Sequence, residues 1–171
     1  MRERISRARD KVLSEKDLGF FCKLSRSRNL SIVFTNGCFD ILHIGHLRYL
    51  EAAKGMGDIL VVAVNSDESV RQIKGPSRPI LPEFARAEMV AGLHCVDAVT
   101  IFDTPDPLPL IKRIKPDILV KGGDWDLNAI VGKDFVESYG GRVVTVPITK
   151  GFSTTEIINK IRSMDQLNNN S

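Results

Sequence analysis

The sequence has 171 residues, a length that suits one domain with an ordinary hydrophobic core. It carries 24 Lys and Arg against 21 Asp and Glu, an excess that suits small anionic substrates but falls short of a nucleic-acid-binding footprint. No apolar run is long enough to cross a bilayer, and no signal peptide is recognisable. The three cysteines are widely spaced and indicate a reducing compartment. We therefore expect a cytoplasmic protein that binds neither membrane nor nucleic acid.

Residues 1–29 are rich in charge, and we expect them to form a helical lead-in to a main domain over residues 30–165. Apolar side chains of this lead-in, among them Leu18, Phe20 and Leu24, are available to pack on the main domain. Residues 166–171 are predicted to form a disordered tail.

The first strand and helix of the main domain follow directly. Residues 32–34 are β-branched or aromatic, as in a strand buried on both faces, and Asn36-Gly37 is a turn signal that ends it. From residue 44 to residue 56 apolar side chains recur at helical spacing, and Gly55 and Gly57 close the segment. This stretch predicts a strand, a glycine turn and a helix.

His43 and His46 are three residues apart, so they lie on one face of this helix, in its first turn. The unpaired N–H groups and the helix dipole favour an anion there. Two imidazoles add hydrogen-bond donors, and Gly37 and Gly45 leave room for a ligand to approach closely. This combination predicts a phosphate site.

Other roles are open to these residues. A His-x-x-His pair could also be half of a zinc site, although no Cys-x-x-Cys or His-Glu-x-x-His pattern supplies further ligands. Cys38 lies near a helix start, where thiolates are stabilised, but no recognisable base accompanies it. We expect Cys38 to be a small residue lining the loop rather than a nucleophile.

Strands and helices alternate along the rest of the chain, which predicts a parallel sheet with ligands at the carboxyl ends of its strands. We therefore expect an α/β fold with a Rossmann-like, doubly wound, five-stranded parallel sheet and helices on both faces. Further strands are predicted over residues 58–64, 96–102, 117–120 and 142–146, and further helices around residues 67–73, 82–93, 110–114, 132–139 and 154–164.

Three loops beyond the histidine motif carry candidate binding residues. Lys74 and Arg78 flank a Gly-Pro-Ser turn and are placed to neutralise phosphate charge, unless they are ordinary surface charges. In Lys121-Gly122-Gly123-Asp124-Trp125, glycines admit a ligand, Asp124 offers acceptors to sugar hydroxyls and Trp125 offers a flat ring face, although a lone Trp is often core. In residues 151–156, Ser153 and Glu156 fit a capping box, and Thr154 and Thr155 add hydroxyls.

Motifs of other nucleotide-binding classes do not occur. The sequence has no Gly-x-Gly-x-x-Gly after a strand and no Gly-x-x-x-x-Gly-Lys-Ser/Thr, so dinucleotide oxidoreductase and P-loop functions lose their main support.

The stretch Gly37-Cys38-Phe39-Asp40-Ile41-Leu42-His43-Ile44-Gly45-His46 resembles the Gly-x-Phe-Asp-x-x-His-x-Gly-His signature of the nucleotidyltransferase superfamily, which includes the cytidylyltransferases. The resemblance covers residues 32–161. The Lys-Gly-Pro-Ser-Arg-Pro loop is similar to that of the heptose-1-phosphate adenylyltransferase branch. Arg86 matches a recurrent family position that we expect to be structural, tying helix to loop.

The resemblance also implies roles for individual residues. His43, His46 and Lys74 would be catalytic, and Mg²⁺ would accompany ATP with no protein ligand assigned to it. Substrate would be bound by Asp40, with orientation of the loop as its alternative role, and by Lys121, Asp124 and Trp125. Nucleotide would be bound by Thr35, Asn36, Gly37, Cys38, Phe39, Gly45, Arg78, Gly122, Ser153, Thr154 and Thr155.

The implied reaction is adenylyl transfer from ATP to D-glycero-β-D-manno-heptose 1-phosphate, giving ADP-heptose and pyrophosphate for the lipopolysaccharide core. The resemblance also implies a homo-oligomer, with a separate heptose kinase and a phosphatase in the same pathway. One alternative is a glycerol-3-phosphate cytidylyltransferase or another sugar-phosphate nucleotidyltransferase, but His94 and Ile148 replace two arginines typical of the glycerol branch. The other alternative is a nucleotide-binding regulatory protein without turnover.

Overall fold

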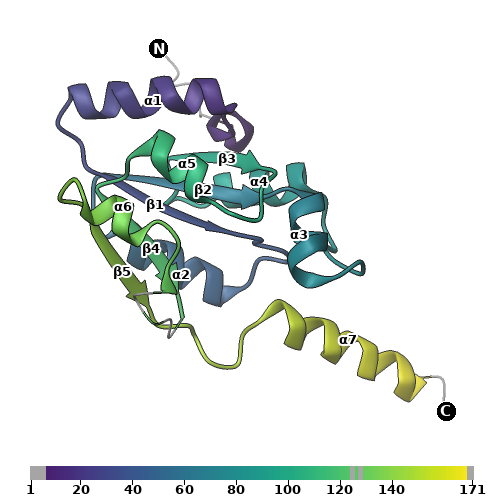
Figure 1. The fold of residues 1–171 in the computed structure, drawn as a ribbon. Helices are drawn as coiled ribbons and strands as arrows, with labels where there is room; N and C mark the ends of the chain where they lie inside the picture. Colours follow the sequence, from purple (N-terminus) through teal and green to yellow (C-terminus); the bar gives the residue numbers. More distant parts are fainter. Residues whose placement is uncertain (1–6, 124–125, 127–128, 169–171) are drawn as a thin grey trace.

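The computed structural model describes residues 7–123, 126 and 129–168, so Asp124 and Trp125, predicted to bind substrate, lie outside the described residues. The chain alternates strands and helices as the sequence predicts (Figure 1). In chain order the described elements are η1 (Ala8–Lys11), α1 (Glu15–Ser27), β1 (Ile32–Gly37), α2 (Ile44–Lys54), β2 (Ile59–Asn65), α3 (Asp67–Lys74), α4 (Glu83–Ala91), β3 (Ala98–Phe102), α5 (Leu108–Ile114), β4 (Ile118–Gly122), α6 (Lys133–Glu137), β5 (Arg142–Val146) and α7 (Thr154–Asn168).

The five strands form one parallel sheet in the order β3-β2-β1-β4-β5. The chain starts at the central strand β1, fills one half of the sheet with β2 and β3, and then returns to the other side of β1 for β4 and β5. This arrangement confirms the predicted doubly wound α/β fold. The reversal lies between β1 and β4, and in such sheets the crevice at the carboxyl ends of these strands is the ligand site.

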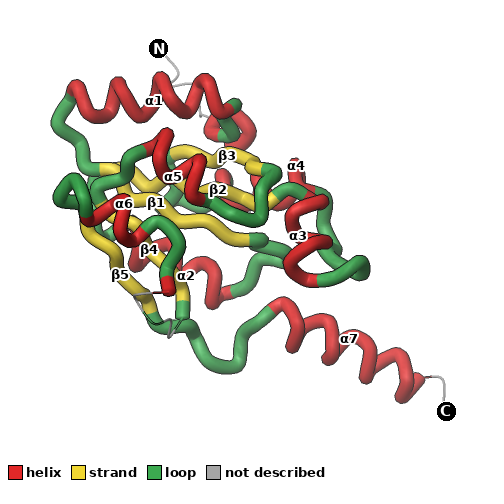
Figure 2. The backbone as a smooth tube through the Cα atoms, viewed as in Figure 1, coloured by secondary structure: helices red, strands yellow, loops and turns green. Residues whose placement is uncertain are grey.

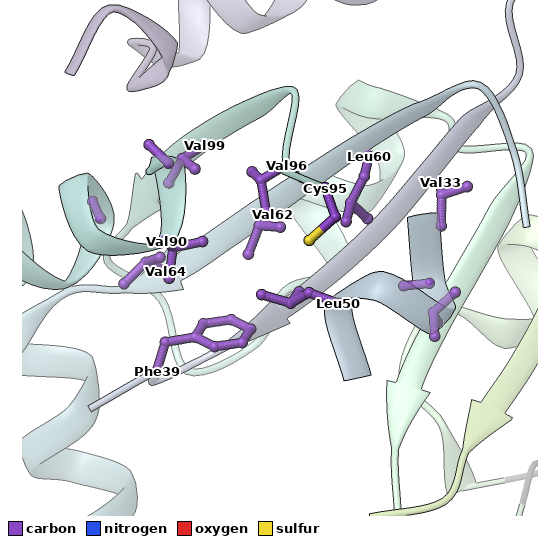
Figure 3. Close-up of a cluster of buried hydrophobic side chains, with 14 of the residues drawn as sticks. Val33, Phe39, Leu50, Leu60, Val62, Val64, Val90, Cys95, Val96 and Val99 are labelled. Atoms are coloured by element: carbon purple, nitrogen blue, oxygen red, sulfur yellow. The ribbon is translucent and has the colours of Figure 1, made fainter. Parts of the chain in front are cut away.

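Helices cover both faces of the sheet because neighbouring residues of a strand point to opposite sides. Val33 packs with residues of α2 and α4, and Figure 3 shows this cluster around Leu50 and Val62. Phe34 points the other way and packs with residues of α1, α5 and α6. Figure 2 shows α1 and α5 on one side of the strands and α2 on the other. The strands are therefore buried on both faces, which explains their continuous apolar runs.

Several strand boundaries differ from the prediction by one to three residues. β1 continues beyond Phe34 to Gly37, because residues 35–37 pair with residues 62–64 of β2 despite the turn signal at Asn36-Gly37. β3 begins at Ala98 rather than at residue 96, and the Asp97 carboxylate just ahead of it accepts a 2.7 Å hydrogen bond from the Leu60 N–H. At the end of β1, tertiary pairing therefore outweighs the local turn preference.

The N-terminal lead-in packs on the sheet, but not with all the side chains expected. Leu18 and Cys22 of α1 are buried in the same cluster as Phe34. Phe20 and Leu24, which the sequence offered as packing residues, are 70% and 41% exposed. They lie on the outer side of a helix that presents only one stripe to the sheet.

Figure 1 shows α7 extending away from the sheet. The helix continues to Asn168, into the segment 166–171 that we predicted to be a tail, and residues 169–171 are not among the described ones. Of the helices that the structure describes, none combines the length and the apolar content needed to span a membrane.

Candidate active site

A cavity of about 640 Å³ opens where β1 and β4 end, at the reversal of the sheet. Its walls come from the β1–α2 segment, the loop after α3, the end of β4 and the start of α7. The structure thus gathers residues from all the motifs that the sequence singled out. The predicted residues that line it are Asn36, Gly37, Cys38, Phe39, Asp40, His43, Gly45, His46, Lys74, Arg78, Lys121, Gly122, Ser153, Thr154 and Thr155.

The two histidines lie at the start of α2, as the spacing predicts. His43 is the N-cap residue, with extended backbone, and His46 lies in the first turn. Their rings stack, with centroids 3.8 Å apart and an interplanar angle of 23°, and the Phe39 ring lies 5.4 Å from that of His46. This arrangement places two imidazoles side by side at a helix N-terminus, where an anion is favoured.

Burial disfavours the charged form of both imidazoles. Burial and, to a smaller extent, the neighbouring His43 together lower the pKa of His46 to about 4, while Asp40 opposes the shift. Burial also lowers the pKa of His43, against the charge of Glu156. Within the described part of the chain, the buried Nδ1 atoms of both rings have no hydrogen-bond partner. Each neutral ring carries one N–H donor that a ligand can use.

Gly45 makes room for neighbouring parts of the protein. A Cβ atom at this position would lie 2.9 Å from Nδ1 of His43 and 3.4 Å from the carbonyl oxygen of Phe152. Likewise, a Cβ atom at Gly37 would lie 3.1 Å from the Phe39 ring. Both glycines therefore let the site residues pack closely, and since both also line the cavity, the ligand approach expected from the sequence stays a prediction.

Asp40 anchors the loop that carries Arg78. Its buried carboxylate accepts hydrogen bonds from Arg78 Nε at 2.8 Å, from the Ile80 N–H at 2.9 Å and from the Leu81 N–H at 3.0 Å. Burial by itself would raise the pKa of Asp40, but these hydrogen bonds and the Arg78 charge lower it overall. Both oxygens are engaged, which favours the loop-orienting role over direct substrate binding.

Arg86 ties the α4 helix to the site loops. Its fully buried guanidinium donates to the carbonyl of Leu81 at 2.9 Å and to that of Cys38 at 2.5 Å. It also forms a 2.8 Å ion pair with Asp67 at the start of α3. Three separate segments therefore meet at one side chain, in agreement with the structural role expected from the sequence.

Two lysines bring positive charge to the cavity in different ways. Lys121 follows the buried part of β4, donates to Asn36 Oδ1, and has a pKa that burial lowers to about 8. Lys74 ends α3 and is exposed to solvent. Arg78 adds a third cation, but Asp40 already offsets its charge. The walls of the cavity are therefore suited to an anionic ligand.

The start of α7 forms the last wall. Ser153 Oγ accepts a 3.1 Å hydrogen bond from the Glu156 N–H, so the helix cap expected from the sequence is present. The Thr154 hydroxyl donates to the carbonyl of Asp40 and joins this wall to the β1–α2 segment. Thr155 lines the cavity and is exposed.

Thr35 is placed differently from the prediction. Its side chain is fully buried, its hydroxyl lies 2.5 Å from that of Tyr49, and it does not line the cavity. The expected nucleotide contact of this side chain is therefore corrected to a contact inside the fold. Cys38 does line the cavity, and burial raises the pKa of its thiol against the smaller effect of nearby cations, which disfavours a nucleophile.

Sequence reasoning left several lining residues out of the predicted site. Tyr49 follows His46 by three residues, so helical spacing could have placed it on the histidine face. The others are mainly apolar and carry no chemical signature. The residues missed are Tyr49, Pro105, Pro107, Ala129, Ile130, Val131, Ile148, Thr149 and Phe152.

A doubly wound sheet with paired imidazoles, a helix N-terminus and cations at its reversal point defines a nucleotidyltransferase-type fold. A family model described as cytidylyltransferase-like matches residues 34–165. The chain belongs to the cytidylyltransferase-like family.

Curated relatives match most of this chain. It is 50% identical over 151 residues to the bifunctional protein HldE of Syntrophotalea carbinolica, and 52% identical over 151 residues to that of Geobacter metallireducens. Each alignment covers 88% of this chain and 31% of the relative. The chain therefore spans about a third of the length of these relatives.

Solved structures agree with the fold. A lipopolysaccharide core biosynthesis protein from Thermoplasma volcanium is 31% identical, with a TM-score of 0.59 over 72% of this chain and 99% of that one. Pantoate-beta-alanine ligase from Francisella tularensis is 16% identical, with a TM-score of 0.56 over 88% of this chain and 77% of that one. The second likeness concerns the fold alone.

Proposed function

We propose that this chain transfers an adenylyl group from ATP to D-glycero-β-D-manno-heptose 1-phosphate, giving ADP-heptose and pyrophosphate for lipopolysaccharide core synthesis. The observation that carries the proposal is the stacked pair His43 and His46 at the N-terminus of α2, inside a cavity lined by cations. Two comparisons support the substrate: the identity of 50% to an HldE protein, and the Thermoplasma volcanium relative named for lipopolysaccharide core biosynthesis.

The proposed reaction is a direct displacement. An oxygen of the sugar phosphate attacks the α-phosphorus of ATP, a new P–O bond forms, and the bond from the α-phosphorus to the bridging oxygen of the β-phosphate breaks. The attacking phosphate is already ionised at neutral pH, so the protein needs no general base. Its task is to align the two phosphates and to stabilise the charge that shifts onto pyrophosphate.

The histidines suit this task as neutral hydrogen-bond donors. With its proton on Nε2, each ring would donate to an oxygen of the α-phosphate or of the bridging position. The low pKa of His46 supports this role, because a ring that stays neutral carries one N–H donor and no charge of its own. Stacking of the two rings would direct both donors to neighbouring oxygens.

Lys74, Lys121 and the start of α7 would hold the rest of the two anions. We propose that Lys74 closes over the triphosphate, since it is exposed at the rim, and that Lys121 serves the sugar phosphate. Ser153, Thr154 and Thr155 line the cavity at a second helix start, where their hydroxyls would reach phosphate oxygens. Asp40 would act through the position of Arg78.

Magnesium would enter with ATP. Among the described residues, no three His, Cys, Asp or Glu side chains come together in a way that could hold a metal ion. The ligands we propose for Mg²⁺ are therefore phosphate oxygens, and its contribution when bound is to neutralise the charge of the triphosphate.

The proposal extends to the setting of the enzyme. We propose a cytoplasmic homo-oligomer, because ATP and sugar phosphates are cytoplasmic metabolites and oligomers are usual in similar proteins. A heptose kinase and a phosphatase would supply the heptose 1-phosphate in the same pathway. Whether that kinase is a separate protein stays a prediction, since the relatives named bifunctional are about three times as long as the matched region.

The test is pyrophosphate release with Mg²⁺, crossing ATP and CTP against heptose 1-phosphate and glycerol 3-phosphate. We expect release only with ATP and the heptose phosphate. Release with CTP and glycerol 3-phosphate would keep the chemistry and overturn the substrate. Binding of ATP without release for any acceptor would instead favour a regulatory nucleotide-binding protein.

A further inference from the structure

The two strands that flank the cavity separate before they reach it. β1 pairs with β2 along its whole length, and β4 pairs with β5 along its whole length. β1 and β4 pair with each other only at Val33–Ile118 and Phe34–Leu119. Thr35 and Val120, the next residues on the two strands, are not paired with each other, and we call the opening that begins there the β1–β4 gap.

Tyr49 bridges the strands at the point where they part. Its hydroxyl lies 2.5 Å from Thr35 Oγ1 on β1 and donates a 3.1 Å hydrogen bond to the carbonyl of Val120 on β4. Since the phenol has a single proton, the Thr35 hydroxyl must donate to Tyr49. Thr35 and Val120 directly follow the last paired residues, so one side chain from α2 takes the place of the missing strand contact.

The Tyr49 ring also rests on the end of β4. A Cβ atom at Gly122 would lie 3.2 Å from Cε2 and 3.4 Å from Cδ2 of this ring. Burial raises the pKa of Tyr49 to about 12, so the phenol keeps its proton at any physiological pH. The ring and the hydroxyl thus fix α2 against two strands at once.

Tyr49 lies on the same face of α2 as the histidines, because residues 43, 46 and 49 recur at a spacing of three. Among the residues that the structure describes, none forms a hydrogen bond with Nδ1 of His43 or His46 that would hold its ring. The orientation of the rings therefore depends on how α2 sits against the ends of β1 and β4. A small rotation of the helix would move both rings relative to Lys121 on β4.

We propose that Tyr49 is a positioning residue, whose hydroxyl, held between Thr35 and Val120, sets the register of the α2 histidine face against the β1–β4 gap. This inference rests on the proposed function, because it assigns Tyr49 a part in the same phosphoryl transfer. Tyr49 acts on the transition state through His43 and His46 and need not touch the substrate.

The first test replaces the hydroxyl alone. Tyr49→Phe keeps the ring on Gly122 and removes the bridge, and misplaced catalytic groups reduce turnover, so kcat should fall by about 10- to 100-fold with KM within about threefold of wild type. The matched control is Tyr139→Phe, which removes a hydroxyl that donates to Pro116 at 2.8 Å and does not line the cavity. Its kcat should stay within about twofold of wild type.

A second variant removes the partner of the bridge. Valine has nearly the same shape as threonine, so Thr35→Val removes the Thr35 hydroxyl with little change in packing. It therefore tests the same bridge if Tyr49→Phe fails to fold. It should lower kcat in the same way, and the double variant should be no slower than the slower single one, because both changes break one unit. A kcat of Tyr49→Phe within about twofold of wild type in folded protein would overturn the proposal.

A readout without turnover separates this inference from the proposed function. The imidazole NMR signals of His43 and His46 should shift in Tyr49→Phe, whereas the signal of exposed His94 should not. If wild type transfers no nucleotide to any acceptor, the proposed function fails, and these signals still decide the positioning role. Unmoved His43 and His46 signals would overturn it.

Discussion

Two walls of the cavity are built in opposite ways. The histidine wall, residues 36–49, is held by part-buried hydrogen bonds to the rest of the fold, which Ile80 donates to Asp40, Arg86 to the Cys38 carbonyl and Thr35 to Tyr49. The lysine wall, formed by Lys74 and residues 152–155, is largely exposed, and Phe152 is 49% exposed. The difference suggests a division of work, in which groups that must keep a fixed geometry rest on the core while charges that meet the incoming anion stay free to reorient.

The comparison predicts that the histidine wall is sensitive to its buried supports. Arg86→Met should lower the free energy of unfolding by about 3–5 kcal/mol, because it leaves Asp67 and two part-buried carbonyls without their donor. Urea denaturation measures this effect. The control is Arg113→Met, which removes an exposed ion pair with Glu15 and should cost at most about 1 kcal/mol. Equal costs for the two variants would contradict the role of Arg86 as a buried support of the histidine wall.

Loss of one histidine should affect the rate most strongly. His46→Ala should reduce kcat by about 100- to 1,000-fold, the usual effect of removing one donor that stabilises developing charge. Steady-state pyrophosphate release measures it, with a thermal melt to show that the variant is folded. His94→Ala is the matched control, since this exposed histidine does not line the cavity. Near-normal turnover of His46→Ala would refute the assigned role.

A substitution in the lysine wall should lower the reaction rate without lowering the stability of the fold. Lys74→Ala should lower kcat/KM by about 10- to 100-fold, because it removes a hydrogen bond to a charged phosphate worth about 1.5–3 kcal/mol. Its melting temperature should match wild type, because the side chain is exposed. Lys16→Ala, an exposed lysine of α1 outside the cavity, is the control. A large drop in melting temperature would show that the lysine wall is structural.

The smallest predicted effect is the acid titration of the histidine wall. Because burial lowers the pKa of His46 from 6.5 to about 4, its imidazole signal in an NMR titration should shift near pH 4. The unfolded chain takes up this proton near pH 6.5, so the stability contributed by a neutral His46 is complete above that pH and is lost as the pH falls toward 4. A midpoint between pH 6 and 7 would contradict the buried, neutral imidazole.

The sequence predicted those features that depend on local periodicity. Spacing alone placed His43 and His46 on one helical face, and apolar runs located the strands. It could not predict that the hydroxyl of Thr35, a buried residue of β1, would form a hydrogen bond with Tyr49. Nor could it predict the three partners of Arg86, which come from separate segments and meet only after folding.

The surroundings of the motif glycines also depend on contacts that form only after folding. A motif glycine indicates close approach, but only the packed structure shows that Gly45 is approached by His43 and Phe152. The end of β1 was likewise set by pairing with β2 and not by the local Asn36-Gly37 signal. Residues whose roles depend on contacts distant in sequence are therefore the ones that sequence reasoning misses.

The central claim, that the sugar phosphate accepts the adenylyl group of ATP through its own oxygen while pyrophosphate leaves, is tested most directly with a heavy-oxygen label. The protein is incubated with ATP, Mg²⁺ and heptose 1-phosphate that carries the label in its phosphate oxygens. The masses of ADP-heptose and pyrophosphate are then measured by mass spectrometry. The account predicts that all of the label appears in ADP-heptose and none in pyrophosphate. Label in the pyrophosphate, or no labelled nucleotide sugar at all, would contradict it.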